Sequence, residues 1–201
     1  ISLNAWPAHK IQLYDGWLLR FSHNYTHRTN CVTPLGNSTL PLNEKIAFCE
    51  TEYRNAHTPT IFKISPLLDK DFDPYLEMRG YEIEHATEVM TMPLDNFNSM
   101  YSIESGTNTL VHISDTITDH WIHNLFRLNG TTNSIHQKIV PSMFKAIPKP
   151  TIVASIVIEG QMVASGLGIL DRGHIGLYAI YVDTAYRKRN FGSAICSAII
   201  N

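Results

Sequence analysis

A run of three basic residues followed closely by a glycine is the part of this sequence best suited to chemistry. Arg187, Lys188 and Arg189 stand a few positions before Gly192. Guanidinium and ammonium groups attract phosphate, and a glycine lets a ligand come close to the backbone. Residues of these types at this spacing indicate a binding site for a phosphate-bearing ligand.

The segments on either side of this basic cluster predict a strand and a helix. Residues 176–182 form an apolar run with β-branched and aromatic side chains, which is typical of a buried strand. In residues 191–200, apolar side chains recur at helical spacing. A helix that begins directly after a turn presents unpaired N–H groups and the positive end of its dipole. The predicted strand–turn–helix corner therefore favours phosphate binding.

The corner also resembles a known motif. Its sequence, VDTAYRKRNFGSA, is similar to the coenzyme A loop of the GNAT N-acetyltransferases, whose signature is Arg or Gln, two residues, Gly, one residue, then Gly or Ala. Arg187 and Gly192 occupy the two ends of that signature, and Asn190 stands where its first glycine is expected. Asn tolerates positive φ better than most residues other than glycine, so we expect the turn to survive the replacement.

The resemblance implies how acetyl-CoA would be held. Backbone N–H groups of residues 188–193 would cradle the pyrophosphate, with Arg187 framing the turn, and main-chain groups of residues 180–182 would hold the pantetheine arm and the acetyl carbonyl. A corner whose basic side chains are merely solvated is the alternative. The implied cofactor-binding residues are Ile180, Tyr181, Val182, Arg187, Lys188, Arg189, Asn190, Phe191, Gly192 and Ser193.

Two side chains of the predicted strand are candidates for proton transfer. Acetyl transfer to an amine requires a positioned thioester, a polarised carbonyl, a base for the amine and an acid for the thiolate. In a regular strand, His174, Gly176, Tyr178 and Ile180 share one face, and the family often carries its base on this strand. Tyr178 and His174 are therefore the catalytic candidates, and a core tyrosine and a turn histidine are the alternatives.

The elements before the corner follow the order of a GNAT domain. Short turns separate the last three strands predicted in the second half, at 151–158, 162–170 and 174–182. We therefore expect these strands to be consecutive antiparallel neighbours. A GNAT domain continues with a strand, a helix and closing strands, so we expect further chain after Asn201. The predicted elements are a strand, two helices and three strands, at residues 109–113, 119–128, 135–144, 151–158, 162–170 and 174–182.

The N-terminal half resembles a GNAT unit only in the order of its elements. Where its phosphate loop is expected, the segment PLGNSTLPLNEK lacks the signature. We therefore predict a mixed, largely antiparallel α+β GNAT fold with a degenerate unit at 1–94, a linker at 95–108 and an acetyl-CoA-binding unit at 109–201. The elements predicted in the first half are strands at 11–21, 25–35, 60–64 and 82–92 and helices at 42–56 and 71–79.

Composition excludes several classes of protein. The chain has 201 residues, a net charge of −2 and ordinary hydrophobic and charged fractions, which argues against a general nucleic-acid binder. The sequence shows neither a membrane-spanning apolar run nor a signal-peptide pattern. Cys31, Cys49 and Cys196 form no CxxC pair and predict free thiols. We expect a cytoplasmic protein without nucleic-acid or membrane partners, and leave a homodimer open.

The histidine pairs in the sequence give no complete metal site. His120 and His123 are spaced i,i+3 on a predicted helix, and His23 and His27 flank a turn. Metal ligation needs a third ligand and supporting groups around it, and neither pair has one that the sequence identifies. No metal site is therefore predicted.

The sequence predicts an N-acetyltransferase that moves an acetyl group from acetyl-CoA to a primary amine of a small molecule, peptide or protein, by direct attack in a ternary complex. The alternative is a non-catalytic acyl-CoA-binding or interaction protein on a GNAT scaffold. A nucleotide-binding P-loop is disfavoured, because no Gly-Lys-Ser/Thr follows the turn.

Overall fold

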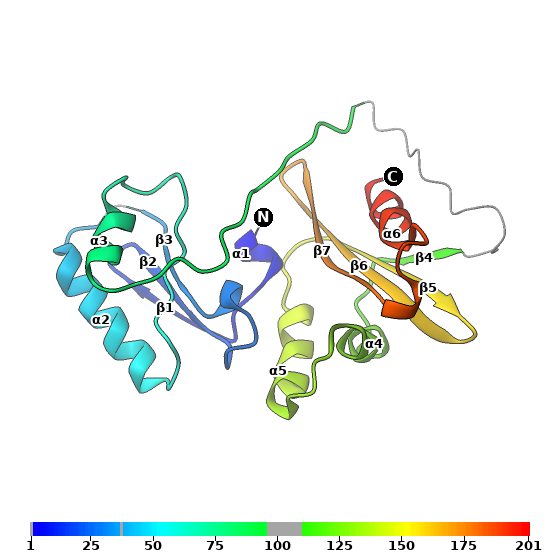
Figure 1. The fold of residues 1–201 in the computed structure, drawn as a ribbon, viewed down its shortest axis with the longest axis horizontal. Helices are drawn as coiled ribbons and strands as arrows, with labels where there is room; N and C mark the ends of the chain where they lie inside the picture. The colour runs from blue at the N-terminus through cyan, green and yellow to red at the C-terminus, as the bar shows by residue number, and fades with distance from the viewer. Residues whose placement is uncertain (1, 37, 96–109) are drawn as a thin grey trace. The chain divides into compact units, whose positions relative to one another are not determined.

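The computed structural model describes residues 2–36, 38–95 and 110–201, which form two compact units (Figure 1). One unit contains Lys10–Phe97, and the other contains Ile1–His9 together with Asn98–Asn201. This division differs from the predicted one, because the first nine residues group with the second unit. The predicted linker at 95–108 lies, apart from Asp95, outside the described residues. Each unit combines helices with an antiparallel sheet, which gives the mixed α+β class.

The sheet of the Lys10–Phe97 unit begins with a hairpin. The predicted single strand at 11–21 is wrong, because Asp15 and Gly16 make a two-residue turn within it. Their φ angles are 41° and 79°, and positive φ at both positions matches the right-handed twist of the flanking strands. The predicted strand at 25–35 is likewise shorter. The observed strands, in sheet order, are β1 (Lys10–Tyr14), β2 (Trp17–Phe21) and β3 (Val32–Pro34).

Helix α2 (Leu42–Asn55) supplies one side of the core of this unit and confirms the helix predicted at 42–56. Ile46, Cys49 and Tyr53 recur at helical spacing, and all three are fully buried in a cluster with residues of β2 and β3. The hydroxyl of Tyr53 donates to the carbonyl of Arg20 at 3.0 Å and accepts from its N–H at 3.1 Å. The buried phenol is therefore fully hydrogen-bonded.

The later elements of this unit are reduced relative to the prediction. In place of a strand at 60–64, the structure has a single parallel bridge between Val32 and Phe62. Helix α3 (Phe72–Met78) occupies the predicted place, and Gly80, with a φ of 85°, follows its end. The N–H of Gly80 bonds the carbonyl of Glu77 at 2.9 Å, which satisfies one of the terminal carbonyls of the helix.

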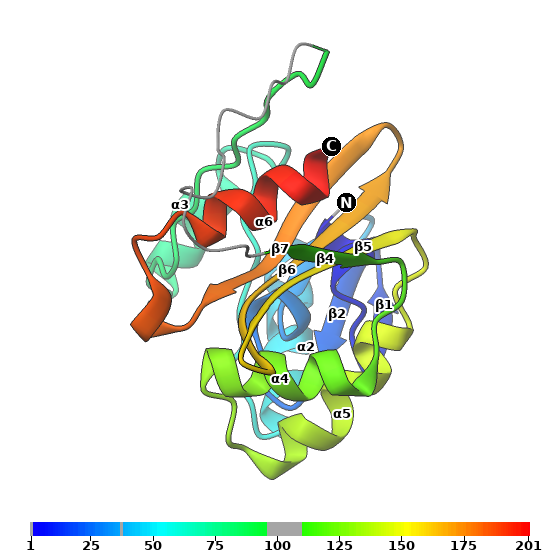
Figure 2. The same cartoon turned by 90° about the vertical axis from the view of Figure 1, so that its right-hand side faces the viewer.

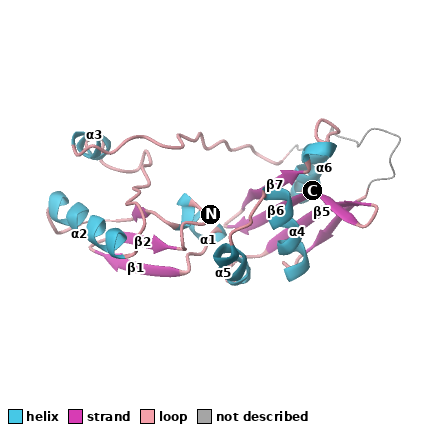
Figure 3. Ribbon diagram, turned by 60° about the horizontal axis from the view of Figure 1, so that its bottom comes forward, coloured by secondary structure: helices cyan, strands magenta, loops and turns pink. Residues whose placement is uncertain are grey.

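The strand predicted at 82–92 is wrong. Residues 82–95 run as an exposed loop after α3, drawn without a strand in Figure 3. The alternating sequence of this segment is compatible with a strand, but a strand needs a neighbour for its N–H and C=O groups. No strand of the described chain pairs with it.

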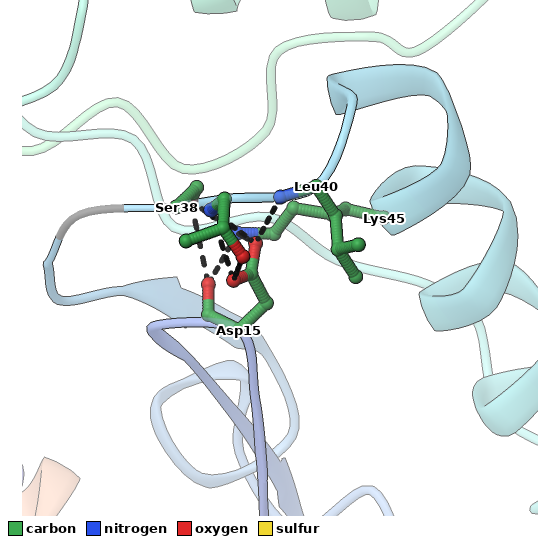
Figure 4. Close-up of polar contacts among 5 residues, drawn as sticks. Asp15, Ser38, Leu40 and Lys45 are labelled. Atoms are coloured by element: carbon green, nitrogen blue, oxygen red, sulfur yellow. Dashed lines mark hydrogen bonds and ion pairs between the residues drawn. The ribbon is translucent and has the colours of Figure 1, made fainter.

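A buried lysine ties the β1–β2 turn to the start of α2 (Figure 4). The Lys45 ammonium lies 3.2 Å from the Asp15 carboxylate and donates to the hydroxyl of Ser38. The same carboxylate accepts from the N–H of Leu40 at 3.0 Å and from the N–H and hydroxyl of Thr39. These bonds, that of Leu40 foremost, hold the pKa of Asp15 well below its ordinary value, whereas burial lowers the pKa of Lys45.

The second unit contains a four-stranded antiparallel sheet in the order β4-β5-β6-β7. The prediction of three consecutive antiparallel strands is confirmed by the pairing of β5 with β6 and of β6 with β7. Two-residue turns join them, each with positive φ at both positions, at 159–160 and 172–173. The strands are β4 (Val111–Ser114), β5 (Thr151–Ile158), β6 (Gln161–Asp171) and β7 (His174–Val182).

Helices cover both faces of this sheet (Figure 1, Figure 2). α4 (Asp119–Asn129) and α5 (Ser134–Lys145) lie on one face and α6 (Phe191–Ile200) on the other, and all three confirm the predicted helices. The hydroxyl of Thr118 accepts from the N–H of Trp121 at 3.1 Å and caps α4. None of the helices in the described ranges is both long enough and apolar enough to cross a membrane.

Helix α6 packs directly on glycine positions of β6. A Cβ atom at Gly166 would lie 2.3 Å from Ile195 Cγ2 and 2.9 Å from Ile199 Cδ1. One at Gly168 would lie 2.4 Å from Ile199 Cγ2. Such separations are well inside van der Waals contact, so the absence of a side chain lets the helix approach the strand. This packing fixes the helix whose first turn is the predicted phosphate site.

The amino terminus docks on the second unit. The ring of Trp6, just after α1 (Ser2–Ala5), lies 5.6 Å from that of Phe144 and 6.5 Å from that of Tyr178. The amide of Asn4 donates to the Asp171 carboxylate at 2.9 Å. This hydrogen bond and a second one from Lys149 lower the pKa of Asp171 to about 2. These long-range contacts explain why the first residues group with 98–201.

Candidate functional site

Asp183 anchors the loop between β7 and α6. Its N–H donates to the carbonyl of Val163 at 2.9 Å, and its carboxylate accepts from the N–H of Ala185 at 3.1 Å, which starts the short helix η2 (Thr184–Tyr186). Arg127 of α4 lies 3.3 Å from the same carboxylate and also donates to the carbonyl of Met162. The ion pair is partly exposed and adds little energy, but these contacts together tie the loop to β6 and α4.

The three basic residues of the loop have different contacts. Arg187 turns back toward β7, and its Nε donates to the carbonyl of Val182 at 3.2 Å. The guanidinium of Arg189 lies 5.2 Å from the ring centroid of Tyr186, a cation–π contact. All three basic residues, Lys188 included, are exposed. Their positive charges therefore stand in solvent next to the start of α6, where an anion can reach them.

The backbone of this loop has two residues in the left-handed conformation. Lys188 and Asn190 have φ angles of 59° and 63°. Asn190 thus adopts the left-handed conformation at the position where the signature has glycine. It is the N-cap of α6, and its side chain makes no capping hydrogen bond. The first N–H groups of a helix have no acceptor within the helix, so this end of α6 can accept an anion.

Gly192 leaves room beside this first turn. A Cβ atom built there would meet only Val182 Cγ2, at 3.8 Å, which is ordinary contact. The fold itself therefore does not require glycine at this position. Packing therefore does not explain the glycine, and the missing side chain would let a ligand approach the backbone here.

A β-bulge interrupts β7 next to Tyr178. Leu167 of β6 pairs with Tyr178, whereas Ser165 pairs with Tyr181, so β7 has one residue more than β6 over this stretch. Ala179 has a φ of 49°, and its carbonyl accepts from the hydroxyl of Ser165 at 3.0 Å. The extra residue bends the strand and shifts its alternation.

The bulge corrects one prediction about side-chain direction. Ile175, before the bulge, and Ile180 and Val182, after it, all pack in the core cluster that contains residues of α6. Tyr178 is paired with Leu167 and contacts Trp6. The prediction that Tyr178 and Ile180 share one face is therefore wrong, because Ala179 reverses the alternation between them.

The structure gathers most of the predicted site residues into one corner. Residues 180–182 end β7, and 187–193 form the loop and the first turn of α6, with Tyr178 at the adjoining bulge. His174 lies at the other end of β7, about 26 Å along the strand from Val182. Its Nδ1 is 2.9 Å from the carbonyl of Arg172 in the hairpin turn. His174 is therefore not brought to the loop.

Two further residues support the loop, and no pattern in the sequence predicts their roles. Arg127 is a single cation on a predicted helix, and Tyr186 is one of nine tyrosines. Their roles depend on contacts with Asp183 and with Arg189, which become visible only in the folded chain.

The chain with this fold and this corner belongs to an acetyltransferase-like family. The family model described as "Probable histone acetyltransferase Rv0428c C-terminal" matches residues 2–201, and the chain is therefore a member of that family. No curated protein matches the sequence significantly.

A solved structure has a similar fold. It is the crystal structure of a functionally unknown conserved protein from Staphylococcus epidermidis ATCC 12228, with a TM-score of 0.57 and 10% sequence identity. The match covers 96% of this chain and 79% of that one. At this identity the likeness concerns the fold alone, a mixed α+β arrangement.

Proposed function

We propose that this protein is a GNAT-type N-acetyltransferase that transfers the acetyl group of acetyl-CoA to a primary amine. The observation that carries the proposal is the left-handed backbone of Asn190 directly before α6. Asn190 is the residue before the first turn of the helix, next to the exposed cations of residues 187–189. The membership in an acetyltransferase-like family supports the same reaction class.

The proposed acetyl-CoA site uses mainly backbone groups. N–H groups of residues 188–193 would bind the pyrophosphate, and Arg187 would hold the turn through its bond to the carbonyl of Val182. The pantetheine arm would lie along residues 180–182. β7 is the last strand in the sheet order, so one edge of it has no neighbouring strand in the described chain. Polar backbone groups on such an edge are available to a ligand.

The reaction would form a C–N bond between the amine and the thioester carbonyl carbon, and break the C–S bond. The amine loses a proton and the coenzyme A thiolate gains one. We assign the base to Tyr178, acting directly or through a water, because it precedes residues 180–182 on the same strand, β7. His174, bonded to its own hairpin turn at the far end of β7, is the less favoured of the two candidates.

The acceptor is proposed as a primary amine, free or on a lysine of a protein. The description of the family names a probable histone acetyltransferase, which makes lysine side chains one class to test. The Lys10–Phe97 unit is proposed as a degenerate GNAT-like unit without its own coenzyme A loop. A reducing cytoplasmic location is part of the proposal, and the free state of all three cysteines agrees with it.

Thiol release tests the proposed reaction. Full-length protein with acetyl-CoA is mixed with a panel of amines that includes a polyamine, free lysine and a histone-tail peptide. We expect release that depends on one of the amines and is lost in Gly192→Trp. Acetyl-CoA binding without amine-dependent release would instead favour the non-catalytic acyl-CoA-binding alternative.

A further inference from the structure

Three metal-ligating side chains meet on the surface of the Lys10–Phe97 unit. They are His27, Glu84 and His85, and their ligand atoms all lie within 4.8 Å of one another. The two imidazole rings are 4.8 Å apart between centroids and are inclined by 59°. From the sequence alone His27 has no third ligand, because Glu84 and His85 lie far along the chain. The fold supplies both.

The backbone on the His27 side is held firmly. His27 begins the short helix η1 (His27–Thr29), whose N-cap, Thr26, accepts from the N–H of Arg28. The carbonyl of His27 accepts from the N–H of Asn30 at 3.2 Å, and the buried side chain of Asn30 donates to the carbonyl of Thr26 at 2.8 Å. The imidazole of His27 therefore projects from a backbone that is fixed by several hydrogen bonds.

The backbone on the other side directs two consecutive side chains to the same place. In a regular extended chain, Glu84 and His85 would point in opposite directions. His85 instead has a φ of 53°, which breaks this alternation, and its carbonyl accepts from the hydroxyl of Thr87 at 2.9 Å. Such a conformation is uncommon outside glycine and is often found at ligand sites.

We propose that His27, Glu84 and His85 bind one Zn²⁺ ion, with water completing a four-coordinate shell. Two imidazoles and a carboxylate are a ligand set that suits zinc. Because zinc–ligand bonds are about 2.0–2.2 Å long, the ligand atoms of one tetrahedral ion lie about 3.3–3.6 Å apart. All three residues are exposed, so rotation of their side chains can close the remaining gap.

The ion would also give residues 82–95 a partner. No strand of the described chain pairs with this segment, and zinc would join its beginning to the loop before β3. Because the proposed site lies in the unit that lacks the coenzyme A signature, zinc binding goes beyond the proposed acetyl transfer.

Calorimetric titration of Zn²⁺ into untagged full-length protein, previously stripped of metal with a chelator, tests the site. We expect one Zn²⁺ per chain, with affinity at least tenfold weaker in His27→Ala, His85→Ala and the nearly isosteric Glu84→Gln. His112→Ala removes an exposed histidine of β4 and leaves the same number of histidines as His27→Ala and His85→Ala. It should bind zinc as the wild type does.

Two spectroscopic readouts separate this site from scattered histidines. Co²⁺ in place of zinc should give the visible absorption of a four-coordinate ion, and hydrogen exchange of residues 82–92 should slow on zinc addition only when all three ligands are present. Absence of zinc binding would contradict the proposal. So would equal binding by wild type and His27→Ala, or an equal loss in His112→Ala.

Discussion

The Lys45 ammonium lies 3.2 Å from the Asp15 carboxylate, on a side chain that is 1% exposed (Figure 4). It also stands 4.0 Å from the ring centroid of Trp17. A buried ammonium is costly unless it is paired and hydrogen-bonded. The turn residue Asp15 is therefore part of what allows a lysine in the core of the Lys10–Phe97 unit.

This pair predicts a loss of stability in acid. The pKa of Asp15 is lowered in the folded state, so its ionised form stabilises the fold above the unfolded pKa of about 4, and this contribution is lost as the pH falls below that value. Burial lowers the pKa of Lys45, and its hydrogen bond to Asp15 opposes that shift.

Urea unfolding at pH 7 and pH 3 measures this loss. We expect a smaller pH-dependent change in the free energy of unfolding for Asp15→Asn than for the wild type. Glu88→Gln removes a carboxylate from the exposed loop and should behave as the wild type does. Identical pH dependence in all three proteins would show that the Asp15 carboxylate has no special role.

The close approach of α6 to β6 predicts that Gly166 cannot be enlarged. Gly166→Ala would place a Cβ atom 2.3 Å from Ile195 Cγ2, and overpacking of this kind costs about 1–3 kcal/mol of unfolding free energy. Gly36→Ala is the control, since a Cβ atom there meets nothing within 4 Å. A wild-type unfolding midpoint for Gly166→Ala would mean that α6 does not pack this closely.

The two candidate bases should differ in steady-state kinetics. Tyr178→Phe keeps the aromatic ring beside Trp6 but removes the hydroxyl, so we expect kcat to fall about 10²-fold while KM for acetyl-CoA is unchanged. His174→Ala should keep the wild-type kcat, because His174 lies at the far end of β7. The reverse result, loss of turnover in His174→Ala alone, would contradict the assignment to Tyr178 and identify His174 as the base.

Much of the second unit could be predicted because its signals are local. The strands β5, β6 and β7 alternate with turn sequences, and α4, α5 and α6 show helical spacing. The conformation of Asn190 could also be predicted, because Asn is the residue that most readily replaces glycine at positive φ. Local chain preferences and the observed structure agree at this corner.

The errors arise where pairing between distant segments decides the structure. Residues 82–92 have a strand-like pattern, but no strand of the described chain pairs with them. The bulge at Ala179 depends on the register with β6, and alanine gives no hint of positive φ. The error at the Asp15–Gly16 turn has another cause. The Asp-Gly sequence is itself a hairpin signal, but the apolar residues on both sides of it made the segment resemble one continuous strand.

Binding of acetyl-CoA at the start of α6 is the central claim, and calorimetry on the full-length protein tests it most directly. We expect one site with a Kd between about 1 µM and 1 mM, the range in which KM values of enzymes usually fall. Gly192→Trp should weaken binding at least tenfold, because its side chain would cover the backbone of the first turn, while Gly36→Trp should bind as the wild type does. Absence of binding to acetyl-CoA and coenzyme A, or equal binding by Gly192→Trp, would contradict the claim.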